Sequence, residues 1–192
     1  MKKFKIYKQE TEHSCGIACL RGVMNYYGND FSEKDIWDKH ESYKAKNGGT
    51  LNPILNLGVT ALKFGFDVIY LGYNLIIATD NPSKGLKESL EERSNKYFEF
   101  GKYYIDEALK FISLGGRIDI DKLNLKRIKE LVRKNKFVLV EIRPTFIYGK
   151  GPISMDHKVI IIGYSKEGFR VLDPSDAKEH VSSHFMQGLP RC

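Results

Sequence analysis

A helical pattern of apolar residues dominates the amino-terminal part of the chain, in residues 14–28, which read SCGIACLRGVMNYYG. Apolar or small side chains recur at intervals of three and four residues, at Cys15, Ala18, Cys19, Gly22, Val23 and Tyr26. A second series follows beside it, at Ile17, Leu20, Met24 and Tyr27. A helix that is apolar nearly all round is buried inside a domain. Ser14 is a residue type that caps helices, and Gly28 is one that ends them.

Cys15 stands at the start of this helix, a position that alters thiol chemistry. A helix N-terminus carries roughly half a positive charge, which favours a thiolate over a thiol. A thiolate nucleophile needs an imidazole partner, and that imidazole needs an orienting group. Cys19, one turn later, is expected to be a small core residue. The chain has three cysteines in no zinc-binding spacing, which predicts free thiols and a cytoplasmic protein.

The carboxyl-terminal third supplies both candidate partners of Cys15. Apolar runs predict strands at 137–143, 158–164 and 169–172, and the last two are joined by a turn at 165–168. His157 opens the middle strand, and Asp173 ends the next one. If these two strands pair antiparallel, their outer ends meet. The carboxylate of Asp173 can then hold the imidazole of His157 in one tautomer.

Helical patterns prevail between these regions. Helices are expected at 32–40, opened by Ser32 and Asp35 as a near capping box, and between Asn52 as the cap and Gly65. Further helices are expected at 125–134 and twice within 81–116, and strands at 67–72 and 4–7. A helix-rich half followed by a mostly antiparallel strand half is an α+β fold, in which the buried amino-terminal helix packs on the carboxyl-terminal sheet. No repeat or linker interrupts the chain. We therefore expect one domain over 1–192, with a possible helical insertion at 81–116.

The insertion has two possible roles. Its aromatic residues are Tyr97, Phe98, Phe100, Tyr103 and Tyr104. Their spacing makes no single helical stripe, so some rings should stay partly exposed and could bind a peptide. Alternatively, the rings only cover the main core. The pair Gly115-Gly116 is similar to a double-glycine cleavage site, but the favoured interpretation is a helix stop.

Composition excludes several classes of protein. The chain has 192 residues, a formal net charge of +7 and 29% charged residues, an ordinary globular balance. The basic residues gather in 121–136 without interleaved aromatics, which favours a solvated helix face over nucleic-acid binding. No apolar run is long enough to span a membrane, and no secretory signal is recognisable.

Two sequence blocks resemble the bacteriocin-processing double-glycine cysteine peptidase family. They are QETEHSCGIACL at 9–20, followed by YYG at 26–28, and HKVIIIGY at 157–164, followed by VLDP at 171–174. The resemblance implies a papain-like fold with Cys15 as nucleophile, His157 as its base, Asp173 as orienting group and Gln9 as an oxyanion donor. Ser14 stands where the family usually has Asp. The chain lacks the transporter domain of well-known members, so a free-standing relative is expected.

These residues predict a thiol-dependent peptidase or amidase. Cys15 would attack a peptide or protein substrate and form an acyl-enzyme, without a metal or organic cofactor. One alternative is an acyltransferase or transpeptidase that uses the same triad. The other is a catalytically inactive peptide-binding module. The four residue types required for turnover are all present, which argues against the inactive module.

Overall fold

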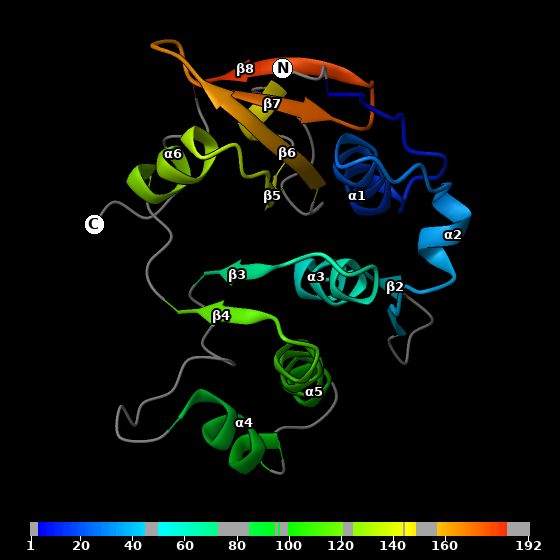
Figure 1. Ribbon diagram of the computed structural model, residues 1–192, viewed down its shortest axis with the longest axis vertical. Helices are drawn as coiled ribbons and strands as arrows, with labels where there is room; N and C mark the ends of the chain where they lie inside the picture. The colour runs from blue at the N-terminus through cyan, green and yellow to red at the C-terminus, as the bar shows by residue number, and fades with distance from the viewer. Residues whose placement is uncertain are drawn as a thin grey trace. The chain divides into compact units, whose positions relative to one another are not determined.

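The computed structural model describes residues 4–44, 50–72, 85–94, 96, 100–120, 125–143, 145–148 and 157–183. The chain divides into two compact units. One, here the terminal unit, combines Met1–Asp38 with Leu123–Cys192, and the other, here the middle unit, is Lys39–Lys122. Cys15, His157 and Asp173 all belong to the terminal unit. Figure 1 traces the elements of both units.

The terminal unit is built on a four-stranded sheet of order β5-β6-β7-β8, in which every neighbouring pair is antiparallel. Its strands are β5 (Val138–Ile142), β6 (His157–Tyr164), β7 (Phe169–Asp173) and β8 (Lys178–Ser182). The first three were expected from the apolar runs. The turn between β6 and β7 closes through a hydrogen bond from the Ser165 N–H to the Gly168 carbonyl, at 2.8 Å. β8 was not expected, because it is a polar edge strand whose Val181 is exposed.

Two helices cover the sheet, as Figure 1 shows for this unit. α1 (Cys15–Tyr26) places Cys19 against Ile160 and Leu172. α6 (Leu125–Arg133) places Ile128 among residues of the alternate positions, such as Val159. Since side chains alternate along a strand, the two helices cover opposite faces of the sheet. The α+β fold class is confirmed, including the buried amino-terminal helix on the carboxyl-terminal sheet.

The amino-terminal segment differs from the expectation in two respects. Residues 4–7 form no strand, because Phe4 and Ile6 instead pack on the cluster of Cys19, Ile160 and Leu172. Their alternation therefore reflects packing on the core. Ser14 precedes α1 but makes no side-chain cap bond. Its hydroxyl oxygen accepts from the Thr11 N–H at 3.0 Å.

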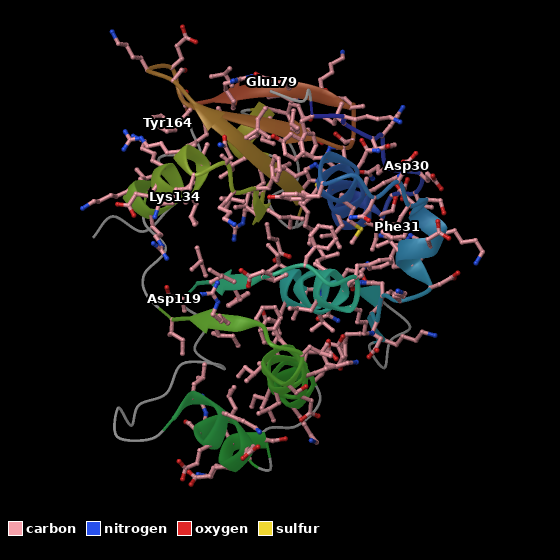
Figure 2. The ribbon with its side chains drawn as sticks, viewed as in Figure 1. Asp30, Phe31, Asp119, Lys134, Tyr164 and Glu179 are labelled. Atoms are coloured by element: carbon pink, nitrogen blue, oxygen red, sulfur yellow. The ribbon has the colours of Figure 1, made fainter. Side chains whose placement is uncertain are left out.

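Helix α2 (Glu33–Trp37) begins as the sequence predicts, with a complete capping box. The hydroxyl of Ser32 accepts from the Asp35 N–H at 3.1 Å, and the Asp35 carboxylate accepts from the Ser32 N–H at 2.8 Å. Ahead of α2, the carboxylate of Asp30, labelled in Figure 2, accepts from the Tyr7 hydroxyl at 3.2 Å. The two bonds between Ser32 and Asp35 satisfy backbone N–H groups that a helix start leaves without partners.

The basic helix α6 presents its cations away from the core. Arg133 donates to the hydroxyl of Tyr164, which Figure 2 labels, and the Lys129 ammonium lies 5.3 Å from the same ring centroid. The short helix α7 (Thr145–Tyr148) follows β5. No helix among the described ranges is long and apolar enough to cross a membrane.

The middle unit has a core of its own between α3 (Ile54–Lys63) and α5 (Phe100–Ser113), in which Leu55, Val59, Ile105 and Phe111 are buried. Its other elements are β1 (Tyr43–Lys44), β2 (Thr50–Leu51), β3 (Ile69–Leu71), α4 (Leu86–Ser94) and β4 (Arg117–Asp119). β1 pairs antiparallel with β2, and β3 pairs parallel with β4. The expected cap of α3 is wrong, because Pro53 occupies that position and Asn52 Oδ1 bonds to His40 Nε2 at 3.2 Å.

The aromatic residues of 81–116 that can be placed pack within the unit. Tyr104 is buried, and the Tyr103 ring lies 4.7 Å from the Tyr43 ring. Tyr97 and Phe98, and the side chain of Phe100, lie outside the described residues. For Tyr103 and Tyr104, this packing agrees with the interpretation that the rings cover a core.

Gly115 and Gly116 end α5. Gly115 has a φ of +90° and its N–H donates to the Ile112 carbonyl at 3.0 Å, while the Gly116 N–H donates to the Phe111 carbonyl at 2.9 Å. A left-handed glycine with two such bonds is a common helix stop. The pair has this structural role, as the favoured interpretation requires.

Candidate active site

His157 and Asp173 lie on neighbouring strands of the sheet. The register pairs Ile160 of β6 with Leu172 of β7, so His157 and Asp173 are diagonal neighbours at the outer strand ends. His157 Nε2 lies 2.8 Å from Asp173 Oδ1. The Asp173 side chain is fully buried and that of His157 is 13% exposed. The structure thus brings these two predicted residues together.

Two further donors hold the Asp173 carboxylate. The backbone N–H of Ser175 donates to Oδ1 at 2.7 Å, and the hydroxyl of Tyr148 donates to Oδ2 at 2.6 Å. Burial alone would raise the pKa of Asp173, but the hydrogen bonds from His157, Tyr148 and Ser175 hold that pKa well below its usual range. Asp173 therefore carries a negative charge against the imidazole. Sequence analysis did not identify Tyr148.

Cys15 is the first residue of α1 and only 8% of it is exposed. Burial acts to raise the pKa of its thiol, but hydrogen bonds to His157 and to the Lys158 backbone, together with the charges of both residues, outweigh burial, so the pKa is lowered. Cys19 shows the contrast, since burial without such a partner raises its pKa well above the ordinary value. Its Sγ lies 3.4 Å from the Lys158 carbonyl oxygen. The two cysteines are thus a polarised thiol and a core thiol.

The pKa of His157 is raised in this group. Burial acts to lower its pKa, but the hydrogen bonds to Asp173 and Cys15 raise the pKa to about 9. A lowered Cys15 pKa and a raised His157 pKa both favour the state in which the proton lies on the imidazole and the sulfur is a thiolate. Nε2 is engaged by Asp173, so Nδ1 is the ring nitrogen that remains for the thiol.

Gln9 lies beside this group, but its amide has another partner. Its backbone N–H donates to the Pro174 carbonyl at 2.9 Å, which ties the amino-terminal segment to the end of β7. Its side-chain Nε2 donates to the Thr11 carbonyl at 2.8 Å. Its Oε1 is buried and has no hydrogen-bond partner within the part of the chain that the structure describes. One N–H of the amide remains for a further acceptor.

A second carboxylate, Glu33 of α2, is buried near the start of α1. Only 1% of Glu33 is exposed, and its Oε1 accepts from the Glu10 N–H at 3.3 Å. Burial raises the pKa of Glu33, although a hydrogen bond with Ser14 opposes the rise. The sequence gave no reason to single out Glu33. Among the described residues, no group of three or more His, Cys, Asp or Glu side chains could hold a metal ion.

One protein-family model matches nearly the whole chain. A model described as the Peptidase_C39 like family matches residues 1–187. The match includes both sequence blocks that carry the resemblance, and it spans both compact units. No curated protein and no solved structure gives a significant match.

Proposed function

From the chain's membership of the Peptidase_C39 like family, a family of cysteine peptidases, we propose that it hydrolyses peptide bonds through an acyl-enzyme on Cys15. The observation that carries this proposal is that the His157 imidazole, held by Asp173 at 2.8 Å, is hydrogen-bonded to a Cys15 thiol whose pKa it lowers. A thiolate beside an imidazolium is both a prepared nucleophile and a prepared acid.

The first half of the reaction forms the acyl-enzyme. The Cys15 thiolate attacks the carbonyl carbon of the scissile bond, and the carbonyl oxygen becomes an oxyanion. When the tetrahedral intermediate collapses, the C–N bond breaks and His157 Nδ1 gives its proton to the leaving amine. The products of this half are an acyl thioester on Cys15 and a neutral imidazole.

The second half restores the enzyme. Neutral His157 accepts a proton from water, and the resulting hydroxide attacks the thioester carbonyl. The C–S bond then breaks, which releases the carboxylic acid product and returns the thiolate beside the imidazolium. The Asp173 carboxylate stays charged throughout and holds Nε2–H, so that Nδ1 always faces the sulfur.

The oxyanion needs donors during both halves. The backbone N–H of Cys15, at the start of α1, is one candidate, since N–H groups at a helix start have no intrahelical acceptor. The side-chain amide of Gln9 is the other. Because one of its N–H groups is bonded to the Thr11 carbonyl, the Gln9 amide serves the oxyanion through its second N–H or by a side-chain rotation.

The substrate is proposed to be a peptide or protein, as in the family. The peptidase fold is proposed as a single papain-like domain over 1–192, a view that the family match over 1–187 supports. The segment 81–116 is proposed to contribute to substrate selection. Acyl transfer to an amine would use the same triad with an amine in place of water.

Trapping of the acyl-enzyme tests the proposal. The protein is mixed with a library of peptides, quenched in acid and weighed by intact mass spectrometry, and the adduct is mapped by digestion. An acyl group on Cys15, absent in Cys15→Ala and kept in the matched variant Cys19→Ala, supports hydrolysis through Cys15. Products formed in ¹⁸O-labelled water distinguish hydrolysis from amine capture. No adduct and no cleavage with any peptide would instead favour an inactive binding module.

A further inference from the structure

The Asp173 carboxylate depends on a side chain outside the three-residue group. Its Oδ1 accepts from both His157 Nε2, at 2.8 Å, and the Ser175 N–H, at 2.7 Å. The donor that the described residues offer to Oδ2 is the Tyr148 hydroxyl, at 2.6 Å. We propose that Tyr148 is a positioning residue that fixes the plane of the Asp173 carboxylate and thereby the His157 imidazole. This inference rests on the proposed function.

The need for a donor at Oδ2 follows from burial. Asp173 is fully buried, so an oxygen without a donor would lack both protein and solvent partners. A carboxylate can relieve that loss by rotating about its Cβ–Cγ bond, which would turn Oδ1 away from the imidazole. The hydrogen bond from the Tyr148 hydroxyl opposes this rotation, because a charge-assisted bond of this length is strong.

The ring of Tyr148 is itself held by a contact with β8. Its ring meets the His180 ring of β8 edge-on, with centroids 5.3 Å apart and an interplanar angle of 82°. His180 Nε2 lies 2.9 Å from Asp176 Oδ2. Tyr148 is 39% exposed, so the surrounding core alone does not fix its ring. The contacts therefore run from Asp176 through His180 and Tyr148 to Asp173 and the imidazole.

A tyrosine that only filled space would be replaced by phenylalanine without effect on the imidazole. The Tyr148→Phe variant keeps the ring and its edge contact with His180 but removes the donor to Oδ2. A loosely held carboxylate stabilises the imidazolium less, so the pKa of His157 falls. A hydroxyl that merely withdrew charge from the carboxylate would have the opposite effect, since its loss would raise that pKa. The sign of the shift separates the two roles.

The experiment measures the pH profile of Cys15 alkylation by iodoacetamide, which needs no substrate. Trypsin releases residues 9–21 as one peptide, and its fragment ions separate Cys15 from Cys19. In Tyr148→Phe, we expect the upper inflection of the profile, where the imidazolium is lost, to move to lower pH. We also expect kcat/KM for a cleaved peptide to fall about tenfold with KM unchanged. Tyr164→Phe, a tyrosine that bonds Arg133 instead, is the matched control and should leave both readouts unchanged.

Paired changes at His180 test the contact of its ring with Tyr148. His180→Phe keeps an aromatic edge against Tyr148 and should behave like the unaltered protein, whereas His180→Ala should show part of the Tyr148→Phe shift. The unaltered protein can show a lowered Cys15 pKa while the upper inflection in Tyr148→Phe is unshifted or raised. That result overturns the positioning role of Tyr148 and leaves the proposed function standing. An ordinary Cys15 pKa in the unaltered protein overturns the ion pair, and with it both proposals. A shifted profile without any peptide cleavage supports the positioning role and counts against the peptidase.

Discussion

At the residue scale, the proposed chemistry depends on whether Cys15 or His157 carries the proton that they share. His157 stabilises the Cys15 thiolate, and burial of Cys15 opposes ionisation. In His157→Ala, burial is opposed by the hydrogen bond and charge of Lys158 without those of His157, so the pKa of Cys15 should rise. Alkylation of Cys15 at mildly acidic pH should then fall at least tenfold, and kcat/KM on the order of 10³-fold. Tyr164→Phe again serves as the control; unchanged alkylation in His157→Ala would remove the ion pair from the mechanism.

Asp173→Asn separates charge from orientation. An amide oxygen can still accept from His157 Nε2, so we expect a smaller loss of kcat/KM than in His157→Ala. A carboxyl whose folded pKa is lowered contributes stability that is present above its unfolded pKa of about 3.9, and that is lost as pH falls through the folded pKa. Urea unfolding should therefore show the unaltered protein losing more stability than Asp173→Asn below about pH 4. If both proteins lost stability in parallel as the pH falls, the lowered pKa would not belong to Asp173.

Gln9→Ala should affect the transition state more than substrate binding. Loss of one oxyanion donor typically costs roughly 3 kcal/mol, so kcat should fall about 100-fold with little change in KM. Steady-state kinetics measure both constants, and Lys8→Ala serves as the neighbouring exposed control. Because the amide is bonded to the Thr11 carbonyl before substrate arrives, an unchanged kcat would assign the oxyanion to backbone N–H groups.

Sequence spacing predicted that His157 and Asp173 lie together, but it did not predict the residues that surround them. The turn at 165–168 places His157 and Asp173 together, because antiparallel pairing through a short turn fixes which residues meet. Tyr148 lies 25 residues before its partner Asp173, on a four-residue helix with no periodic signal. Glu33 sits in an ordinary capping sequence. Contacts of this kind depend on tertiary packing, which leaves no local pattern in the sequence.

At the element scale, apolar periodicity predicted the buried elements and missed the peripheral ones. α1 and strands β5, β6 and β7 carry continuous apolar patterns, and they were expected in place. β4 contains the alternating residues Arg117, Ile118 and Asp119, and it becomes a strand only through its parallel partner β3. Residues 4–7 show the converse, since an alternating pattern there packs on the core without pairing. A short strand is decided by its partner more than by its own residues.

Gly116 offers an element-scale test of the end of α5. A Cβ built there would lie 2.4 Å from a ring atom of Phe111, which is itself fully buried. Gly116→Ala should therefore destabilise the chain by about 1–3 kcal/mol, as overpacking does. Gly85→Ala, where a Cβ meets no atom within 4 Å, is the matched control and should be neutral or slightly stabilising. Chemical denaturation measures both; equal stability of the two variants would contradict the tight packing on Phe111.

At the scale of the whole molecule, the chain leaves the terminal unit after Asp38 and returns to it at Leu123. Cys15 is supplied before this excursion, and His157 and Asp173 are supplied after it. The middle unit is contiguous and has its own buried cluster around Phe111. The prediction of an insertion at 81–116 falls inside this unit, whose bounds are wider. The sequence could not reveal those bounds, because its expected helices look alike on both sides of Asp38.

Two buried phenylalanines test whether the units depend on each other. Phe111 of the middle unit and Phe169 of β7 are both fully buried, so truncation of either to Ala should cost about 3–5 kcal/mol. If the units are separate, Phe169→Ala should abolish the low-pKa alkylation of Cys15, whereas Phe111→Ala should leave it unchanged.

Calorimetry should then show that Phe111→Ala lowers the midpoint temperature of one unfolding transition and leaves that of another unchanged. Its effect on turnover decides the role of 81–116, since substrate selection there requires that cleavage of a long peptide falls while hydrolysis of a small activated ester persists. Loss of Cys15 reactivity in both variants would mean that the thiolate–imidazolium pair requires the core of the middle unit. The two units would then fold as one cooperative structure, and the interruption between Cys15 and His157 would be part of the catalytic framework.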